Sequence, residues 1–438
     1  MTDLALRGAV YSLVNDPFLH AVEDCVVYES DGLILIRNGM IRAVGDYGKL
    51  KDQLPDGIKT HHYPDAILLP GFVDAHIHYP QVEIIGSYGA QLLEWLNKYT
   101  FPAEAKFNDP EHAREIADFF IAELLRNGST AASVFCTSAP LSVDAIFEAA
   151  GAQNMLILAG KMMMDSYAPG DILDTAEASY DDSKALIERW HKRGRCLYTV
   201  TPRFALTSSP RQLELAGALM REHSDVRLQS HISENLAEVA RAAELYPARK
   251  NYTDIYDHYG LLNERAIYGH GIHLSEAELL RFHETGAKIA HCPTSNFFIG
   301  SGLFDIATTK DAARPVTVGL GTDVGGGTSF SMLQTMSEAY KMAQLRGISA
   351  TVAQSYYLAT LGSAEALGIA ESVGSLQAGC PADIAVLDPQ ATPLLKLRAD
   401  VAETLDELLF ALMICADDRA IQATYVAGEL VYARDDTT

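Results

Sequence analysis

The apolar positions of this chain follow two rhythms, and the change falls near residue 66. Before that point the apolar residues form short strand-like runs, and Asp31-Gly32 and Asn38-Gly39 are typical of β-hairpin turns. From Ala66 onward, short apolar runs alternate with longer segments of helical periodicity. The chain therefore begins with a β-rich part and continues with strands that alternate with helices.

The alternating part predicts eight strands, most of them followed by a helix. The strands are continuous apolar runs, which is typical of parallel strands buried on both faces. Asp109-Pro110 supplies an N-cap and a first-turn proline for one of the helices. This order predicts a (β/α)₈ barrel. The expected strands are residues 67–73, 129–135, 155–164, 196–201, 226–231, 266–270, 288–291 and 316–323.

The last part of the chain is again strand-like. Helical patterns at 331–345 and 350–367 are followed by apolar strand-like runs at 384–387 and 420–431. We expect the two strand-rich ends to pair into one small β-sandwich domain beside the barrel. The expected domains are residues 1–65 with 370–438 for the sandwich, and 66–369 for the catalytic barrel.

Composition and charge narrow the choice of partners. The chain has 438 residues, of which 48% are hydrophobic, and a net charge of -23 that would repel a nucleic acid. No apolar run approaches the roughly 18 residues that span a bilayer, and the start of the chain lacks a signal-peptide pattern. The six cysteines are scattered without a CxxC, as in reduced proteins. We therefore expect a cytoplasmic protein without a nucleic-acid or membrane partner.

Candidate chemistry gathers at the expected carboxyl ends of the strands, where the active sites of such barrels lie. His76 and His78 are two positions apart and so face the same side of a strand. Taken alone, this pair fits two surface histidines as well as a metal site. Further polar residues at other strand ends are His231, Glu234, His270 and Asp323.

Several imidazoles and a carboxylate at one rim suit a divalent metal with one position open to water. A bound zinc lowers the pKa of its water to about 7, which makes hydroxide available at neutral pH. A carboxylate that does not bind the metal, such as Glu234, can carry a proton between water and substrate. Because one strand-end histidine is most often structural, the combination and not any single residue indicates metal-dependent hydrolysis.

Five motifs resemble those of the amidohydrolase superfamily: PGFVDAHIH, SHISEN, YGHG, AHCPTSN and GLGTDVGGG. The resemblance spans about residues 30–430, although Cys380 stands where that family usually has lysine. Residues 92–107, LLEWLNKYTFPAEAKF, and residues 201–209, TPRFALTSS, are similar to the guanine deaminases within this superfamily. The resemblance implies a barrel enzyme that hydrolyses a ring amine.

The resemblance also implies roles for particular residues. The metal ligands would be His76, His78, His231 and Asp323. The catalytic residues would be Glu234 as the proton shuttle, with Asp323 and His270 beside the nucleophile. The substrate would be bound by Gln81 and Arg203, with Phe204 and Trp95 in the pocket wall.

The implied reaction is hydrolysis of guanine at C2 to xanthine and ammonia, by a homodimer that binds guanine and water. One divalent metal per chain is expected, Zn²⁺ or alternatively Fe²⁺. The fourth strand segment, CLYTVTPRF, lacks the lysine that bridges two metals in binuclear relatives. Lys161 on the third strand is either an alternative bridge or the partner of a carboxylate.

Other interpretations stay open at this stage. Another deaminase or hydrolase of the superfamily, acting on a different purine, a triazine or a nucleoside derivative, would share the metal site and differ in the pocket. A non-catalytic scaffold would lack ligands that are all present here. Arg203 could instead pair with an acidic residue and hold its loop. His291 fits either a contact with the leaving group or a hydrogen bond at the rim.

Overall fold

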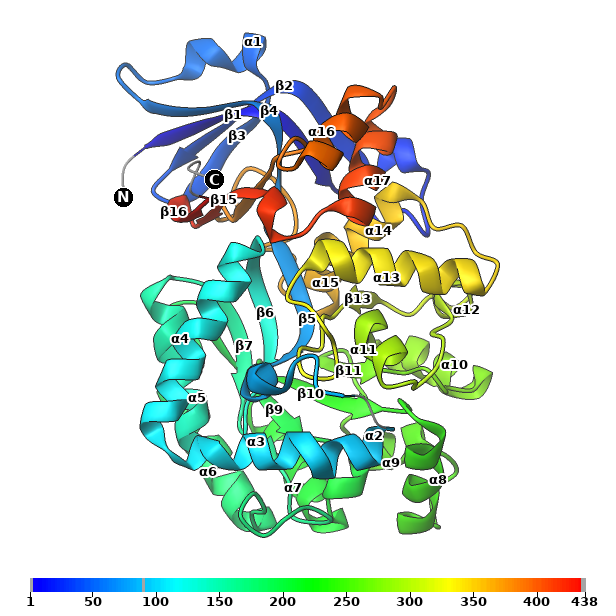
Figure 1. Ribbon diagram of the computed structural model, residues 1–438. Coiled ribbons are helices and arrows are strands. Elements are labelled where there is room, and N and C mark those ends of the chain that lie inside the picture. Colours follow the sequence, from blue (N-terminus) through cyan, green and yellow to red (C-terminus); the bar gives the residue numbers. More distant parts are fainter. Residues whose placement is uncertain (1–2, 89–90, 435–438) are drawn as a thin grey trace.

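The computed structural model describes residues 3–88 and 91–434 and contains a barrel and a separate sheet (Figure 1). Neighbouring strands of the barrel run parallel, and the short strand β8 (Met162–Met163) pairs with β9. In spatial order the barrel strands are β5 (Phe72–His78), β6 (Ser129–Phe135), β7 (Leu156–Gly160), β9 (Cys196–Pro202), β10 (Arg227–Ile232), β11 (Ala266–His270), β12 (Lys288–His291) and β13 (Val318–Leu320).

Hydrogen bonds from the segment after β13 return to β5 and bring the first and last strands together. The backbone N–H of Asp323 donates to the carbonyl of His76 over 2.9 Å, and that of Thr322 donates to the Asp74 carboxylate over 3.1 Å. The predicted (β/α)₈ barrel is therefore confirmed. Its strands end at one rim, so the residues predicted at the strand ends can form one shared site.

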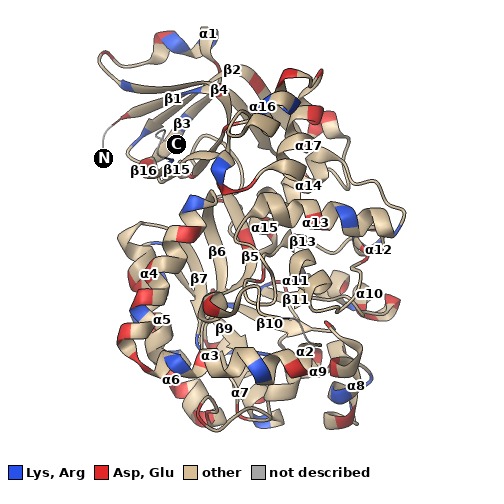
Figure 2. Cartoon of the chain, viewed as in Figure 1, with Lys and Arg blue, Asp and Glu red and all other residues tan. Residues whose placement is uncertain are grey.

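An outer layer of helices surrounds the barrel, and Figure 2 shows that many of the Lys, Arg, Asp and Glu positions lie on these helices. Asp109 caps the first of these helices by accepting the Glu111 N–H over 3.0 Å, as predicted. The main helices of this layer are α4 (Pro110–Arg126), α5 (Pro140–Ala152), α6 (Ala176–Trp190), α7 (Pro210–Glu222), α8 (Leu236–Leu245), α10 (Glu276–Thr285) and α13 (Met332–Leu345). Within the described residues, no helix has both the length and the apolar character needed to cross a membrane.

The two ends of the chain form one mixed sheet of seven strands, which confirms the expected β-rich unit. The sheet has its own apolar core, and β4 pairs in parallel with β1 and antiparallel with β14. In spatial order its strands are β16 (Glu429–Ala433), β15 (Ile421–Val426), β14 (Ile384–Leu387), β4 (Lys59–Pro70), β1 (Leu4–Leu13), β2 (Val26–Arg37) and β3 (Met40–Asp46).

The structure corrects the first predicted barrel strand. Ile67 to Pro70 belong to β4 in the seven-stranded sheet, and the barrel begins only at Phe72. Gly71 joins the two sheets at a point without room for a side chain, since a Cβ there would lie 2.1 Å from Oγ1 of Thr130. The apolar run continues through this crossing because both sheets bury it, so the sequence pattern alone does not reveal the change of sheet.

Helices in the last third of the chain were also predicted incompletely. The stretch 350–367 forms two helices, α14 (Val352–Ala359) and α15 (Leu361–Ala366). Two more helices, α16 (Pro393–Asp400) and α17 (Leu405–Cys415), were missed, and Figure 1 shows them beside the seven-stranded sheet. Their N-cap threonines, Thr392 and Thr404, are the signal that could have located them.

Candidate metal centre and active site

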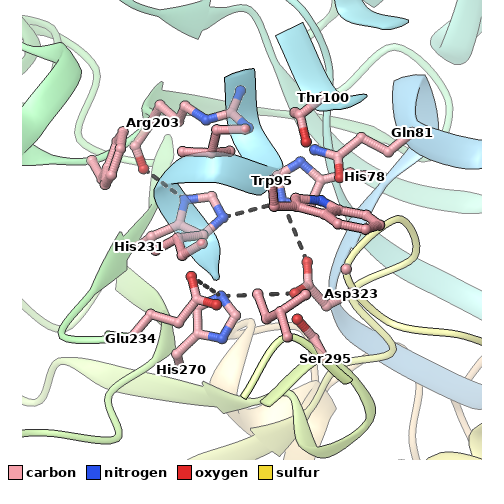
Figure 3. Close-up of a pocket in the computed structure, with 15 residues that line it drawn as sticks. His78, Gln81, Trp95, Thr100, Arg203, His231, Glu234, His270, Ser295 and Asp323 are labelled. Atoms are coloured by element: carbon pink, nitrogen blue, oxygen red, sulfur yellow. Dashed lines mark hydrogen bonds and ion pairs between the residues drawn. The ribbon is translucent and has the colours of Figure 1, made fainter. Parts of the chain in front are cut away.

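Four histidines and one aspartate from four strand ends meet at the rim of the barrel. Figure 3 shows three of the histidines, His78, His231 and His270, together with Asp323. The Nε2 atoms of His78 and His231 are 3.1 Å apart. Oδ1 of Asp323 lies 3.4 Å from Nε2 of both His76 and His78. His270 completes the group, with its Nε2 3.8 Å from Oδ2 of Asp323. The structure thus brings together all the side chains that the sequence proposed for a metal centre.

The hydrogen bonds of these histidines leave lone pairs directed into the cluster. Nδ1 of His231 lies 2.7 Å from the carbonyl oxygen of Arg203, which only accepts, so this nitrogen carries the proton and Nε2 does not. Burial lowers the pKa of His78 and of His231 well below the usual value, which keeps both rings neutral. Nε2 of His76 is buried and has no hydrogen-bond partner among the described residues. Converging neutral imidazoles, with a buried nitrogen that makes no hydrogen bond, fit a bound cation.

Two overlapping sets of side chains could hold such a cation. Their donor atoms are those that divalent transition metals prefer, imidazole nitrogen and carboxylate oxygen, with one thiol. The sets are His76, His78 and His231, and His76, His270, Cys292 and Asp323. Cys292 was not predicted, although it directly follows the end of β12 in the AHCPTSN motif.

Lys161 lies outside this cluster. Its ammonium group contacts the carboxylate of Asp174 and lies 3.9 Å from that of Asp182 on α6. This arrangement agrees with the interpretation that Lys161 neutralises a carboxylate, and it gives no support to a bridging role.

Glu234 lies beside the cluster and is held from two sides. Its Oε1 accepts a hydrogen bond from Ser301 over 2.9 Å, and its Oε2 is 3.4 Å from Nε2 of His270. Burial raises the pKa of Glu234 to about 7. A carboxyl group that titrates near neutral pH can both accept and donate a proton during catalysis.

Asp74 supports the cluster from behind. This buried carboxylate accepts hydrogen bonds from the backbone N–H and the hydroxyl of Thr322, over 3.1 and 2.5 Å, and from the N–H of His76 over 3.2 Å. It therefore ties the strand that carries His76 to the segment that carries Asp323. Sequence reasoning missed Asp74, although it lies inside the PGFVDAHIH motif.

A cavity opens onto the cluster and Glu234. Its wall includes all four residues predicted to bind substrate: Gln81, Trp95, Arg203 and Phe204. Further wall residues come from α2 (Leu92–Trp95) and the π-helix η4 (Leu96–Thr100), which α3 (Phe101–Ala105) follows. The residues predicted to bind substrate and the histidine cluster thus border the same cavity.

Arg203 lines the cavity and is also paired with an acidic residue, as the second interpretation expected, and its role toward a substrate stays a prediction. Its Nη1 lies 2.8 Å from each carboxylate oxygen of Glu104, a buried residue that sequence reasoning missed. His291 lines a different cavity, and its ring stacks on Phe304 with 4.5 Å between centroids. This position does not favour a contact between His291 and a leaving group.

Comparisons with known proteins support the family resemblance that the sequence motifs indicated. The chain is 48% identical to the guanine deaminase of Escherichia coli over 434 residues, which cover 98% of both chains. The solved structure of E. coli guanine deaminase superposes with a TM-score of 0.96, covering 98% of this chain and 100% of that one. A guanine deaminase of C. acetobutylicum, solved with guanine in its active site, is 26% identical, with a TM-score of 0.88 and coverage of 98% and 100%.

Residues 67–431, which include the whole barrel and every residue of the cluster, match the amidohydrolase family. The motifs at the strand ends, the barrel and these matches agree, and the resemblance inferred from the sequence is confirmed. The chain belongs to the amidohydrolase family.

Proposed function

We propose that this protein is a guanine deaminase, which hydrolyses guanine at C2 to give xanthine and ammonia. The observation that carries the proposal is that Arg203 and Gln81 line the same cavity as Glu234 and the histidine cluster. The 48% identity to the E. coli enzyme along almost the whole chain supports the same substrate.

We propose that one zinc ion binds to the cluster. Zinc suits this donor set, and hydrolysis needs a Lewis acid without redox chemistry. When bound, the ion supplies a water molecule that is acidic enough to act as a nucleophile at neutral pH. The proposed ligands are His76, His78, His231 and Asp323.

Glu234 is the proposed proton carrier. It accepts a proton from the attacking water and delivers it to N3 of the purine, so that negative charge does not build up on the ring as the new C2–O bond forms. Glu234 then takes the second proton, from the new C2 hydroxyl, and transfers it to the amine. The C2–N bond breaks, the C2–O bond becomes a carbonyl, and ammonia leaves. His270 contacts both Glu234 and Asp323, at 3.4 and 3.8 Å, and so keeps the two carboxylates beside the nucleophile.

Recognition of guanine depends on its C6 carbonyl. Arg203 presents N–H donors in a planar fork, which suits a carbonyl oxygen. Gln81 offers a donor and an acceptor for the adjacent amide edge. Phe204 and Trp95 supply apolar walls. Adenine carries an amine at C6, so it would leave these polar groups unpaired.

We further propose that the enzyme is a cytoplasmic homodimer that works in purine breakdown. The family resemblance supports this assignment. Light scattering after size exclusion should give a mass of twice 47.6 kDa. A monomer at micromolar concentration would contradict the dimer.

The test of the function is a substrate panel of guanine, adenine, pterins and triazines, with ammonia release as the readout. We expect guanine to be the best substrate by a wide margin. A higher kcat/KM on a triazine or on another purine would assign the protein to a different activity within the amidohydrolase family.

A further inference from the structure

The carboxylate of Glu104 is buried under the cavity wall and has no place in the reaction described above. Glu104 belongs to α3 and is 2% exposed. Both of its oxygens accept hydrogen bonds from Nη1 of Arg203 over 2.8 Å, and Oε1 also accepts one from Nε2 of Gln81 over 3.3 Å. One side chain thus connects the two residues that would recognise the substrate.

The contact occupies only part of the arginine. Nη1 of Arg203 is bound to Glu104 and to the sulfur of Met162, whereas Nε and Nη2 have no hydrogen-bond partner in residues 3–88 and 91–434. A guanidinium group is rigid and planar, so fixing one nitrogen fixes the direction of the other two. Nε and Nη2 remain available for a carbonyl oxygen in the cavity.

Gln81 is oriented in the same way. With its amide nitrogen directed to Glu104, its Oε1 faces Gly325, where a Cβ would lie only 2.2 Å away. The amide oxygen has no hydrogen-bond partner within the described chain and can accept an N–H from the substrate. Without the Glu104 carboxylate, the amide could rotate and present the wrong atom.

We propose that Glu104 is a positioning residue that orients Arg203 and Gln81 toward the carbonyl and N–H edge of the purine. This inference rests on the proposed function, because it concerns the same substrate. The charge of Glu104 also neutralises that of Arg203, so that a neutral ring can enter a chamber whose arginine is 3% exposed.

The main variant is Glu104→Gln, which keeps the shape of the side chain and removes its charge. Its matched control is Glu94→Gln, an exposed position in the same segment. Metal content and melting temperature are measured first, and kcat and KM on guanine follow. A displacement of about 1 Å in a recognition group costs roughly 10²-fold in rate, so we expect kcat/KM of Glu104→Gln to fall about that much, while the control stays near the parent.

A double-mutant cycle separates positioning from a general structural role. Arg203→Lys keeps the positive charge but loses the planar fork. Because Glu104 acts through Arg203 as well as Gln81, the loss caused by Glu104→Gln should shrink to well below 10²-fold in the Arg203→Lys background, since coupled residues are not additive. The same loss of about 10²-fold in both backgrounds would overturn the proposal, as would a Glu104→Gln enzyme within about threefold of the parent.

If Glu104→Gln does not fold, Glu104→Asp serves in its place, because it keeps the charge and shortens the reach to Arg203. An unchanged kcat/KM in Glu104→Asp would overturn the inference. Failure of the proposed function is a separate result, since the parent enzyme itself would then release no ammonia from guanine.

Discussion

The substitution Glu234→Gln tests the proton transfer at the centre of the proposed mechanism. The variant preserves the shape of the side chain but can no longer accept a proton. Burial raises the pKa of Glu234 from 4.5 to about 7, a difference worth about 3 kcal/mol in proton affinity. General acid–base catalysis contributes roughly 10²–10⁴-fold, so kcat should fall by that factor, which corresponds to a rise of about 3–5 kcal/mol in the activation free energy.

Metal content should survive this change, because neither set of cluster residues that could hold a cation includes Glu234. The assay is steady-state ammonia release, with the bound metal measured on the same samples. Glu115→Gln, at an exposed position on α4, is the control for a glutamate lost elsewhere. Ser301→Ala removes the hydrogen bond to Oε1 and should cost roughly tenfold, since Glu234 keeps its charge but loses one support.

The pH profile adds a second readout. Glu234 must be ionised to accept a proton, so kcat/KM of the parent should fall as the pH drops through the pKa of Glu234. That acidic limb should lie near pH 7 or below it, because burial raises the pKa to about 7 and a bound cation lowers it. The limb should disappear in Glu234→Gln. A kcat close to that of the parent, with metal bound, would refute the assignment.

Three further predictions concern the metal, the substrate and the joint between the two sheets. Purified enzyme should contain one divalent ion per chain and lose activity on chelation, and two ions per chain at full activity would contradict the single site. Arg203→Leu should lose guanine turnover but keep its metal. In the parent enzyme, kcat/KM for adenine should be at least about 10⁴-fold lower than for guanine, since a site that binds a carbonyl group rejects an analogue without it. Asp383→Ala should lower the free energy of unfolding, measured by chemical denaturation, by about 3 kcal/mol and leave kcat unchanged. The reason is that it breaks the ion pair with Arg195, at 2.6 and 3.0 Å, which joins the barrel to the seven-stranded sheet.

The sequence by itself determined the barrel and the polar residues at its rim. Runs such as 129–135, 266–270 and 288–291 form strands with the predicted bounds, because a buried parallel strand needs an unbroken apolar segment. His76, His78, His231, His270 and Asp323 could be placed together because parallel strands all end at one rim. These conclusions need only local pattern and strand direction.

Only the tertiary structure decided which residues support the site. Asp74, Glu104 and Cys292 each lie inside a stretch that the sequence analysis singled out. The partners of two of them are nevertheless far away in the chain: Glu104 pairs with Arg203, 99 residues later, and Asp74 with Thr322, 248 residues later. No periodic pattern encodes such pairs, since a buried carboxylate is stabilised by whichever donors the fold brings to it. The sequence also did not reveal that the chain passes from one sheet to the other at Gly71. Both sheets bury the same apolar run, so only the tertiary structure shows which residues belong to which sheet.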